Sequence, residues 1–152
     1  MVFEHDYTNF PELTNRQIEE FGFTSPHVQI TENFNAEVVR VHDGDTITVS
    51  TSFRDFIFPI RFLDIDAPEM NEGGEEARDY VRGRILNKIV TVLINRKNRV
   101  DKWGRLLGRI IHGGSDIGEE ELRLGIVTTF KNRREEQLPK MDKMFNIKQW
   151  VS

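Results

Sequence analysis

Residues 36–65 contain the feature that most restricts the fold: a succession of stretches rich in β-branched and aromatic residues, with polar and apolar side chains alternating over 46–50. Alternation of this kind is typical of β-strands, because successive side chains point to opposite faces of a sheet. Two such stretches, 38–41 and 46–50, flank Asp43-Gly44, a dipeptide typical of hairpin turns. A third stretch, 56–65, places Arg61 on the face opposite its phenylalanines. We therefore expect a hairpin followed by a third strand.

Downstream residues predict a helix and two more strands. Ala77, Val81 and Ile85 repeat every four residues, which predicts an amphipathic helix over 75–86 that lies on the sheet. Residues 89–94 and 106–111 have strand patterns, and a polar turn over 101–105 separates them. These strands bring the expected total to five.

Capping signals predict further helices. Thr14 and Gln17 have the spacing of a capping box, which predicts a short helix over 15–21. Asp116 has the position of an N-cap and Gly125 that of a C-cap, which predicts a helix between them. A last helix is expected between about 134 and 150, and it avoids a kink if it begins at Pro139.

Composition indicates one globular domain. The chain has 152 residues, of which 38% are hydrophobic and 30% charged, as in ordinary globular domains. It has no cysteine, and this excludes disulfides and thiolate zinc sites. We assign 34–152 to the main domain and 1–33, rich in polar residues and turn formers, to an N-terminal extension. The chain start lacks a secretory signal pattern, and no stretch is long enough to span a bilayer. We therefore expect an intracellular, cytoplasmic protein that does not bind membranes.

The net charge of −4 argues against a general nucleic-acid coat, because non-specific binding depends on many Lys and Arg residues. A protein that acts on nucleic acid would then concentrate its positive charge locally. Two basic runs are candidates, one over 131–134 and one formed by Arg96, Lys97, Arg99, Lys102 and Arg105. The alternative for each run alone is solvated loop charge.

Two pairs of carboxylates stand next to predicted strands. Asp43 and Asp45 flank the turn glycine, and Asp66 and Glu69 flank a proline after the third strand. Such oxygen ligands suit Ca²⁺ or Mg²⁺, and Ca²⁺ takes about 6 to 8 oxygens, which leaves room for water and a substrate phosphate. Each pair alone has a simpler explanation, a hairpin turn or a helix entry. Arg61, within an apolar strand, needs a bound anion or a buried salt bridge.

Three motifs resemble those of the staphylococcal nuclease family: D-G-D-T at 43–46, I-R-F-L-D-I-D-A-P-E at 60–69 and D-K-W-G-R at 101–105. They occur in the family order within roughly residues 36–130, and Arg61 stands five positions before Asp66 as the family pattern requires. The resemblance implies a mainly β, α+β fold, an OB-type five-stranded barrel with about three packed helices. The five predicted strands agree with that barrel.

The resemblance also implies a metal site. Asp45 and Asp66 would give carboxylate oxygens to Ca²⁺, the backbone carbonyl of Ala67 would be a third ligand, and Asp43 would make an outer-shell contact. Family members usually have Thr in the position of Ala67, but a main-chain ligand is preserved by that change. Ca²⁺ is the expected cofactor, with Mg²⁺ and Mn²⁺ as alternatives.

Three residues have implied catalytic roles. Glu69 would position or deprotonate the attacking water, while Arg61 and Arg105 would hold the scissile phosphate. A guanidinium suits this role because it binds phosphate oxygens in a bidentate way and keeps its charge.

The expected substrate contacts depart from the family pattern. Lys131 and Arg133 replace family tyrosines that stack on the nucleotide, and with Lys102 and Trp103 they are the candidate substrate-binding residues. Trp103 either stacks on a base or serves in packing.

Together these features predict a Ca²⁺-dependent nuclease that hydrolyses the phosphodiester bonds of DNA, RNA or both. The alternative is a catalytically inactive barrel that binds nucleic acid or protein. The presence together of all the implied metal ligands and catalytic residues argues against this alternative. We expect a monomer, in which the N-terminal extension either packs on the barrel or docks a protein partner.

Overall fold

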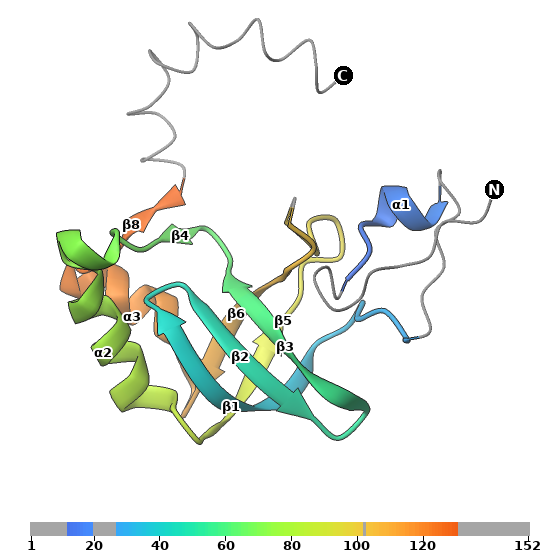
Figure 1. Ribbon diagram of the computed structural model, residues 1–152, viewed down its shortest axis with the longest axis horizontal. Helices are drawn as coiled ribbons and strands as arrows, with labels where there is room; N and C mark the ends of the chain where they lie inside the picture. The colour runs from blue at the N-terminus through green and yellow to red at the C-terminus, as the bar shows by residue number, and fades with distance from the viewer. Residues whose placement is uncertain (1–11, 20–26, 102, 131–152) are drawn as a thin grey trace, which may run out of the picture.

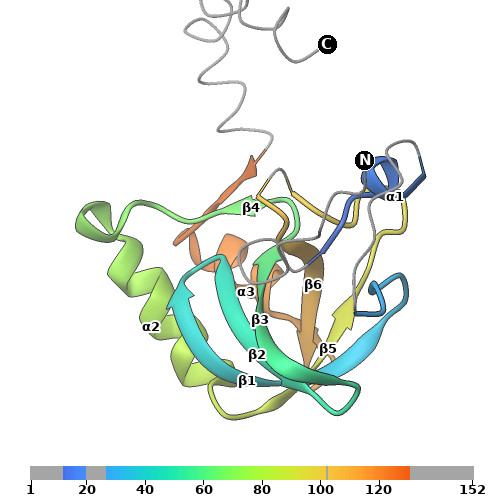
Figure 2. The ribbon, with the colours of Figure 1, turned by 45° about the vertical axis from the view of Figure 1, so that its right-hand side comes forward.

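The structure is a computed structural model that describes residues 12–19, 27–101 and 103–130. Its main element is a closed barrel of five strands: β1 (Phe34–Asp43), β2 (Thr46–Thr51), β3 (Arg54–Phe62), β5 (Ile89–Leu93) and β6 (Leu106–His112). The strands are neighbours in the order β3-β2-β1-β5-β6, and β6 pairs in parallel with β3 to close the barrel (Figure 1, Figure 2). The OB-type five-stranded barrel expected from the sequence is confirmed.

Apolar side chains from all five strands fill the barrel. Those that are buried include Val38, Val41, Ile47, Val49, Phe58, Ile60, Val90, Val92, Leu106 and Ile110. Burying one such side chain stabilises a fold by roughly 1.5–3 kcal/mol. The barrel is therefore a rigid support for side chains at its strand ends.

Two helices pack on neighbouring parts of the barrel. α2 (Gly74–Ile85) lies against β1 and buries Ala77, Val81 and Ile85, the residues whose spacing predicted it. α3 (Ile117–Leu124) lies against β6 and contacts α2. α1 (Asn15–Glu19) lies on the opposite side of the molecule from α2 in Figure 1.

The capping contacts match the sequence patterns. The Thr14 hydroxyl accepts the Gln17 N–H at 3.1 Å, and the Gln17 side chain accepts the Thr14 N–H at 2.9 Å. At α3, the Asp116 side chain accepts the Glu119 N–H at 3.1 Å, and Gly125 ends the helix with a φ of 72°. These predictions are confirmed, whereas the helix expected between 134 and 150 lies outside the described residues.

The third strand is shorter than its pattern predicted. β3 ends at Phe62, so the prediction of a single strand up to residue 65 is wrong. Asp64 has a φ of 66°, in the left-handed region, and this turns the chain away from the barrel. The next residues form β4 (Ile65–Asp66), which pairs with β8 (Thr128–Thr129). The turn brings Asp66 back toward Arg61, as the ion pair between them shows.

Two short elements complete the described fold. A 3-10 helix (Met70–Glu72) precedes α2, and β7 (Ser115–Asp116) pairs with the end of β6. None of the described helices is long and apolar enough to cross a membrane. β1 begins at Phe34, and the division of the chain into an extension and a main domain at that point stays a prediction.

Candidate active site

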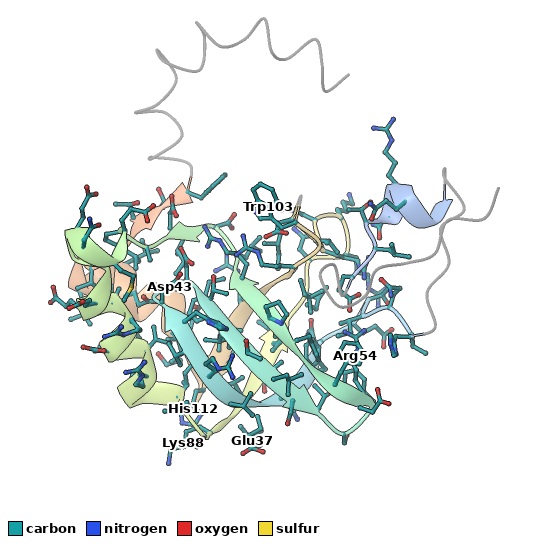
Figure 3. All side chains as sticks on the ribbon, viewed as in Figure 1. Glu37, Asp43, Arg54, Lys88, Trp103 and His112 are labelled. Carbon is teal, nitrogen blue, oxygen red and sulfur yellow. The ribbon has the colours of Figure 1, made fainter. Side chains whose placement is uncertain are left out.

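The Asp43-Gly44-Asp45 turn joins β1 to β2 and is fixed by close packing. The Asp45 N–H donates to Asp43 Oδ1 at 3.0 Å, which closes the turn. A Cβ on Gly44 would lie 2.5 Å from the Cβ of Ala77, so only glycine lets the turn approach α2 this closely. Figure 3 shows Asp43 at the tip of the hairpin, at the end of the barrel away from Glu37 and Lys88.

Asp45 is the most buried carboxylate of the predicted site, with 7% of its surface exposed. Its Oδ1 accepts the Thr46 hydroxyl at 2.9 Å, and its Oδ2 accepts the Ala67 N–H at 2.8 Å. Burial raises the pKa of Asp45 to about 6, the hydrogen bond with Asp43 adds to the rise, and the charge of Arg61 opposes it. The site therefore holds more negative charge than its surroundings fully stabilise.

Arg61 lies between the two predicted carboxylate ligands. Its Nη1 is 3.3 Å from Asp45 Oδ2, and its Nη2 is 3.3 Å from Asp66 Oδ1. Nη1 also donates to the carbonyl of Ile65 at 2.9 Å. The barrel produces this arrangement, because Arg61 of β3 pairs with Thr46, next to Asp45. The structure thus brings Asp43, Asp45, Arg61, Asp66 and Ala67 together.

Glu69 lies farther out. Glu69 is exposed and immediately precedes the 3-10 helix. Its backbone carbonyl accepts the N–H groups of Glu72 and Gly74. Within the described residues its carboxylate makes no hydrogen bond or ion pair. The structure therefore fixes the backbone of Glu69 and leaves its carboxylate accessible to solvent.

Arg105 belongs to a short loop that precedes β6. Its Nε donates to Asp101 Oδ2 at 2.7 Å, and Asp101 Oδ1 accepts the backbone N–H of Trp103 and Arg105. Because Leu106 pairs with Ile60, Arg105 lies next to the strand that carries Arg61. The terminal nitrogens of Arg105 have no partner among the residues the structure describes.

Of the four predicted substrate contacts, one can be placed. Trp103 is 53% exposed, and Figure 3 shows it at the same end of the molecule as Asp43. It lies in the surface loop of Arg105 and not in the core. Lys102, Lys131 and Arg133 lie outside the described residues.

Arg99 corrects the prediction of a basic surface over 96–105. Its side chain is 2% exposed and forms an ion pair with Glu12 at 3.2 Å. Arg99 therefore belongs neither to a nucleic-acid surface nor to a solvated loop. Its guanidinium is buried and contacts partners inside the protein. Arg96 and Lys97, in contrast, are exposed.

The sequence analysis missed Glu121, which lies in α3 beneath the turn. It is fully buried, its Oε2 lies 2.9 Å from where a Cβ on Gly44 would be, and neither carboxylate oxygen has a hydrogen-bond partner in the described structure. Burial, with the charges of Asp45 and Asp43, raises the pKa of Glu121 to about 9. Its spacing of four residues from Ile117 is the signal that could have placed it on the inner face of α3.

The chemistry of the donors fits a hard divalent cation. Asp43, Asp45 and Asp66 offer carboxylate oxygens, and Arg61 alone among the contacts described here offsets their charge. No group of three or more His, Asp and Glu side chains among the described residues is placed to bind a metal ion. A cation at Asp45 and Asp66 would therefore need further oxygens from main chain, water or substrate.

Comparisons with known proteins show which family the chain resembles. A family model described as "Staphylococcal nuclease homologue" matches residues 59–149. A relative named "Uncharacterized endonuclease" from Escherichia coli O157:H7 is 32% identical over 101 residues, which cover 65% of this chain and 63% of that protein. The micrococcal nuclease of Shigella flexneri is 38% identical over 77 residues, which cover 50% and 41%. The protein ParB of Escherichia coli is 40% identical over 75 residues, which cover 49% and 40%. The chain thus spans less than two thirds of the length of these relatives.

Proposed function

Since the chain belongs to the staphylococcal nuclease homologue family, we propose that it is a divalent-cation-dependent nuclease that hydrolyses the phosphodiester bonds of DNA, RNA or both. The observation that supports this most directly is the position of Arg61 between Asp45 and Asp66. A guanidinium that two carboxylates orient on a rigid strand is well placed to receive a phosphate. The names of relatives as endonuclease and micrococcal nuclease support the same activity.

Asp45 and Asp66 would hold the cation, with the backbone carbonyl of Ala67 as a further ligand and Asp43 as outer-shell support. The raised pKa of Asp45, caused first by burial, supports this assignment, because a nearby divalent charge would favour the ionised form. Ca²⁺ is the proposed ion, with Mg²⁺ and Mn²⁺ as alternatives. A bound cation would supply Lewis-acid stabilisation of the phosphate oxygens.

The two arginines would bind the scissile phosphate and stabilise the charge that develops on it. The ion pairs of Arg61 are 3.3 Å long, whereas strong charge-assisted hydrogen bonds measure about 2.7–2.9 Å, so a phosphate can compete for this guanidinium. Arg105 is anchored through Nε by Asp101, which leaves its terminal nitrogens for phosphate oxygens. Glu69, with its accessible carboxylate, would orient the attacking water or accept its proton.

A cleavage assay tests the proposal. The full chain with Ca²⁺ should cut single-stranded DNA, duplex DNA or RNA, and EDTA should stop the reaction. Glu69→Gln and Arg105→Lys should each lower kcat by about 100-fold or more, the loss typical of removing one transition-state contact. Glu72→Gln removes an exposed carboxylate three residues from Glu69 and should retain activity.

Two outcomes would contradict the proposal. Wild-type protein that cuts none of these substrates with Ca²⁺, Mg²⁺ or Mn²⁺, or a Glu69→Gln variant as active as wild type, would remove the catalytic assignment. Tight nucleic-acid binding without cation and without cleavage would favour the alternative, an inactive binding barrel. Thermal unfolding gives an independent readout of the cation, since Ca²⁺ should raise the Tm of wild type and not that of Asp45→Asn.

A further inference from the structure

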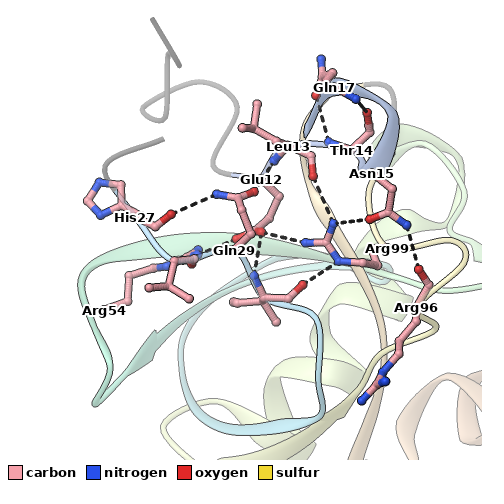
Figure 4. A network of polar contacts seen from close by, with 12 residues as sticks. Glu12, Leu13, Thr14, Asn15, Gln17, His27, Gln29, Arg54, Arg96 and Arg99 are labelled. Carbon is pink, nitrogen blue, oxygen red and sulfur yellow. Dashed lines mark hydrogen bonds and ion pairs between the residues drawn. The ribbon is translucent and has the colours of Figure 1, made fainter. Parts of the chain in front are cut away.

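A buried ion triad fastens the N-terminal segment to the barrel. Glu12 Oε1 is 2.7 Å from Nη2 of Arg54 in β3, and Glu12 Oε2 is 3.2 Å from Nη2 of Arg99 (Figure 4). The Glu12 side chain is 0% exposed, and both arginine side chains are 2% exposed. Groups buried to this degree depend on one another, because loss of one partner leaves an uncompensated charge inside the protein.

Arg99 joins two separate stretches of the N-terminal region. Its Nε donates to the carbonyl of Ile30 at 2.7 Å. Its Nη1 donates to the carbonyl of Leu13 at 3.1 Å and to Asn15 Oδ1 at 3.0 Å. Figure 4 shows the guanidinium surrounded by these acceptors. With Glu12 included, all three guanidinium nitrogens of Arg99 contact residues that precede β1.

The same segment also contacts the loop that carries Arg105. The loop begins at Arg99, whose carbonyl accepts the Leu107 N–H at 2.7 Å, and Gly104 lies close to its tip. The Glu12 N–H donates to the carbonyl of Gly104 at 3.1 Å. Residues near Glu12 therefore hold this loop at its start and next to Arg105.

We propose that Glu12 and Arg99 are positioning residues for Arg105, so that the N-terminal segment is a working part of the substrate-binding rim. The inference rests on the proposed function in one respect, the role of Arg105 in binding phosphate. Asp101 fixes Arg105 within the loop. Glu12 links the loop to the barrel, since it contacts both Arg99 and Arg54 of β3. Displacement of a phosphate-binding group by about 1 Å can lower a rate by about 100-fold, so a contact this far from the phosphate can still control kcat.

Arg99→Lys, in the full chain, tests the proposal, because lysine keeps the charge and loses the planar set of donors. Hydrogen exchange should be at least about 10-fold faster for the amides of Gly104 and Leu107, and about unchanged for β5. With Ca²⁺ and denatured DNA, kcat should fall by about 10-fold or more, with a smaller change in KM. Glu32→Gln is the matched control, since it removes an exposed ion pair of the N-terminal region, with Arg96, and Glu32 does not contact Arg99. It should change neither readout.

A double-mutant cycle with Arg105→Lys separates positioning from general stability. If Arg99 acts through Arg105, the effect of Arg99→Lys on kcat should shrink to about twofold or less when Arg105 is already replaced. If Arg99→Lys does not fold, Asn15→Ala removes one donor contact of Arg99 near the surface and enters the same cycle.

Equal kcat losses with and without Arg105 would overturn the proposal, as would unchanged hydrogen exchange in the loop. Faster exchange with an unchanged kcat would overturn the catalytic link as well. If wild type cleaves nothing, the proposed nuclease function fails. The exchange data then decide independently whether the N-terminal segment holds the loop.

Discussion

Replacing Glu121 by leucine should stabilise the protein at neutral pH. The side chain is fully buried beneath the turn at Gly44, and neither oxygen has a hydrogen-bond partner among the described residues. Burial, followed by the charges of Asp45 and Asp43, raises its pKa from an ordinary 4.5 to about 9. Between these pH values the folded protein holds a proton on Glu121 that the unfolded chain releases.

The magnitude follows from this difference in proton binding. Each pH unit between the two pKa values lowers the free energy of unfolding by about 1.4 kcal/mol, because folding has to take up a proton. At pH 7 the loss for Glu121 is roughly 3 kcal/mol, since pH 7 lies about 2.5 units above the ordinary pKa of 4.5. The stability is therefore fully present below pH 4.5 and is lost as the pH rises toward 9. Leucine has a similar volume and binds no proton, so Glu121→Leu removes this dependence.

Urea unfolding in EDTA measures the effect. From about pH 5.5 to about pH 8, the advantage of Glu121→Leu over wild type should grow by about 3 kcal/mol. Burial raises the pKa of Asp45 to about 6, but Glu121 is protonated over this pH range, so Asp45 titrates beside a neutral side chain in both proteins. Glu119→Gln removes an exposed carboxylate of the same helix and controls for net charge. An advantage that does not change with pH would contradict the prediction, because Glu121 would then be ionised or paired in the folded protein.

Two further predictions concern neighbouring contacts and use the same urea assay. Gly44→Ala should destabilise the protein by about 1–3 kcal/mol because its Cβ would meet that of Ala77 at 2.5 Å, while Gly83→Ala, with nothing within 4 Å of the new Cβ, should stabilise α2 by about 0.5–1 kcal/mol. Equal effects of the two alanines would contradict this. Glu120→Gln should destabilise the protein at pH 7 by roughly 2 kcal/mol, because hydrogen bonds from Arg84 lower the pKa of Glu120 to about 2. That stability is present above pH 4.5 and is lost as the pH falls toward 2, so wild type and variant should converge in acid.

The parts of the fold that the sequence predicted are those set by short-range patterns. Runs of β-branched and aromatic residues located the barrel strands, and the spacing of Ala77, Val81 and Ile85 located α2. The pattern failed at Asp64, because alternation continues through a residue whose left-handed backbone ends the strand. Only the pairing of β4 with β8, more than sixty residues away, shows that the chain has left the barrel there.

The residues of the site and its surroundings were also predicted where local motifs identify them, and missed where distant contacts decide. Motif spacing identified Asp45, Arg61 and Asp66, and the structure brings these three together, although their roles stay predictions. Arg99 was assigned to a basic surface because its sequence neighbours are charged. Its actual environment depends on Glu12, 87 positions earlier, and no local pattern carries that information.

The distribution of charge at the turn indicates which requirement shaped it. A site selected for stability alone would pair Asp45 and Glu121 fully or replace Glu121 with an apolar residue, because both carboxyl groups are buried and both have raised pKa values. One guanidinium, Arg61, contacts Asp45, and none contacts Glu121 among the described residues. Burial has a cost in both cases, because Glu121 has to take up a proton in the folded protein, and ionised Asp45 keeps a buried negative charge that a divalent cation would offset. The instability predicted for wild-type Glu121 at neutral pH and the cation affinity proposed for Asp45 therefore have a common physical origin.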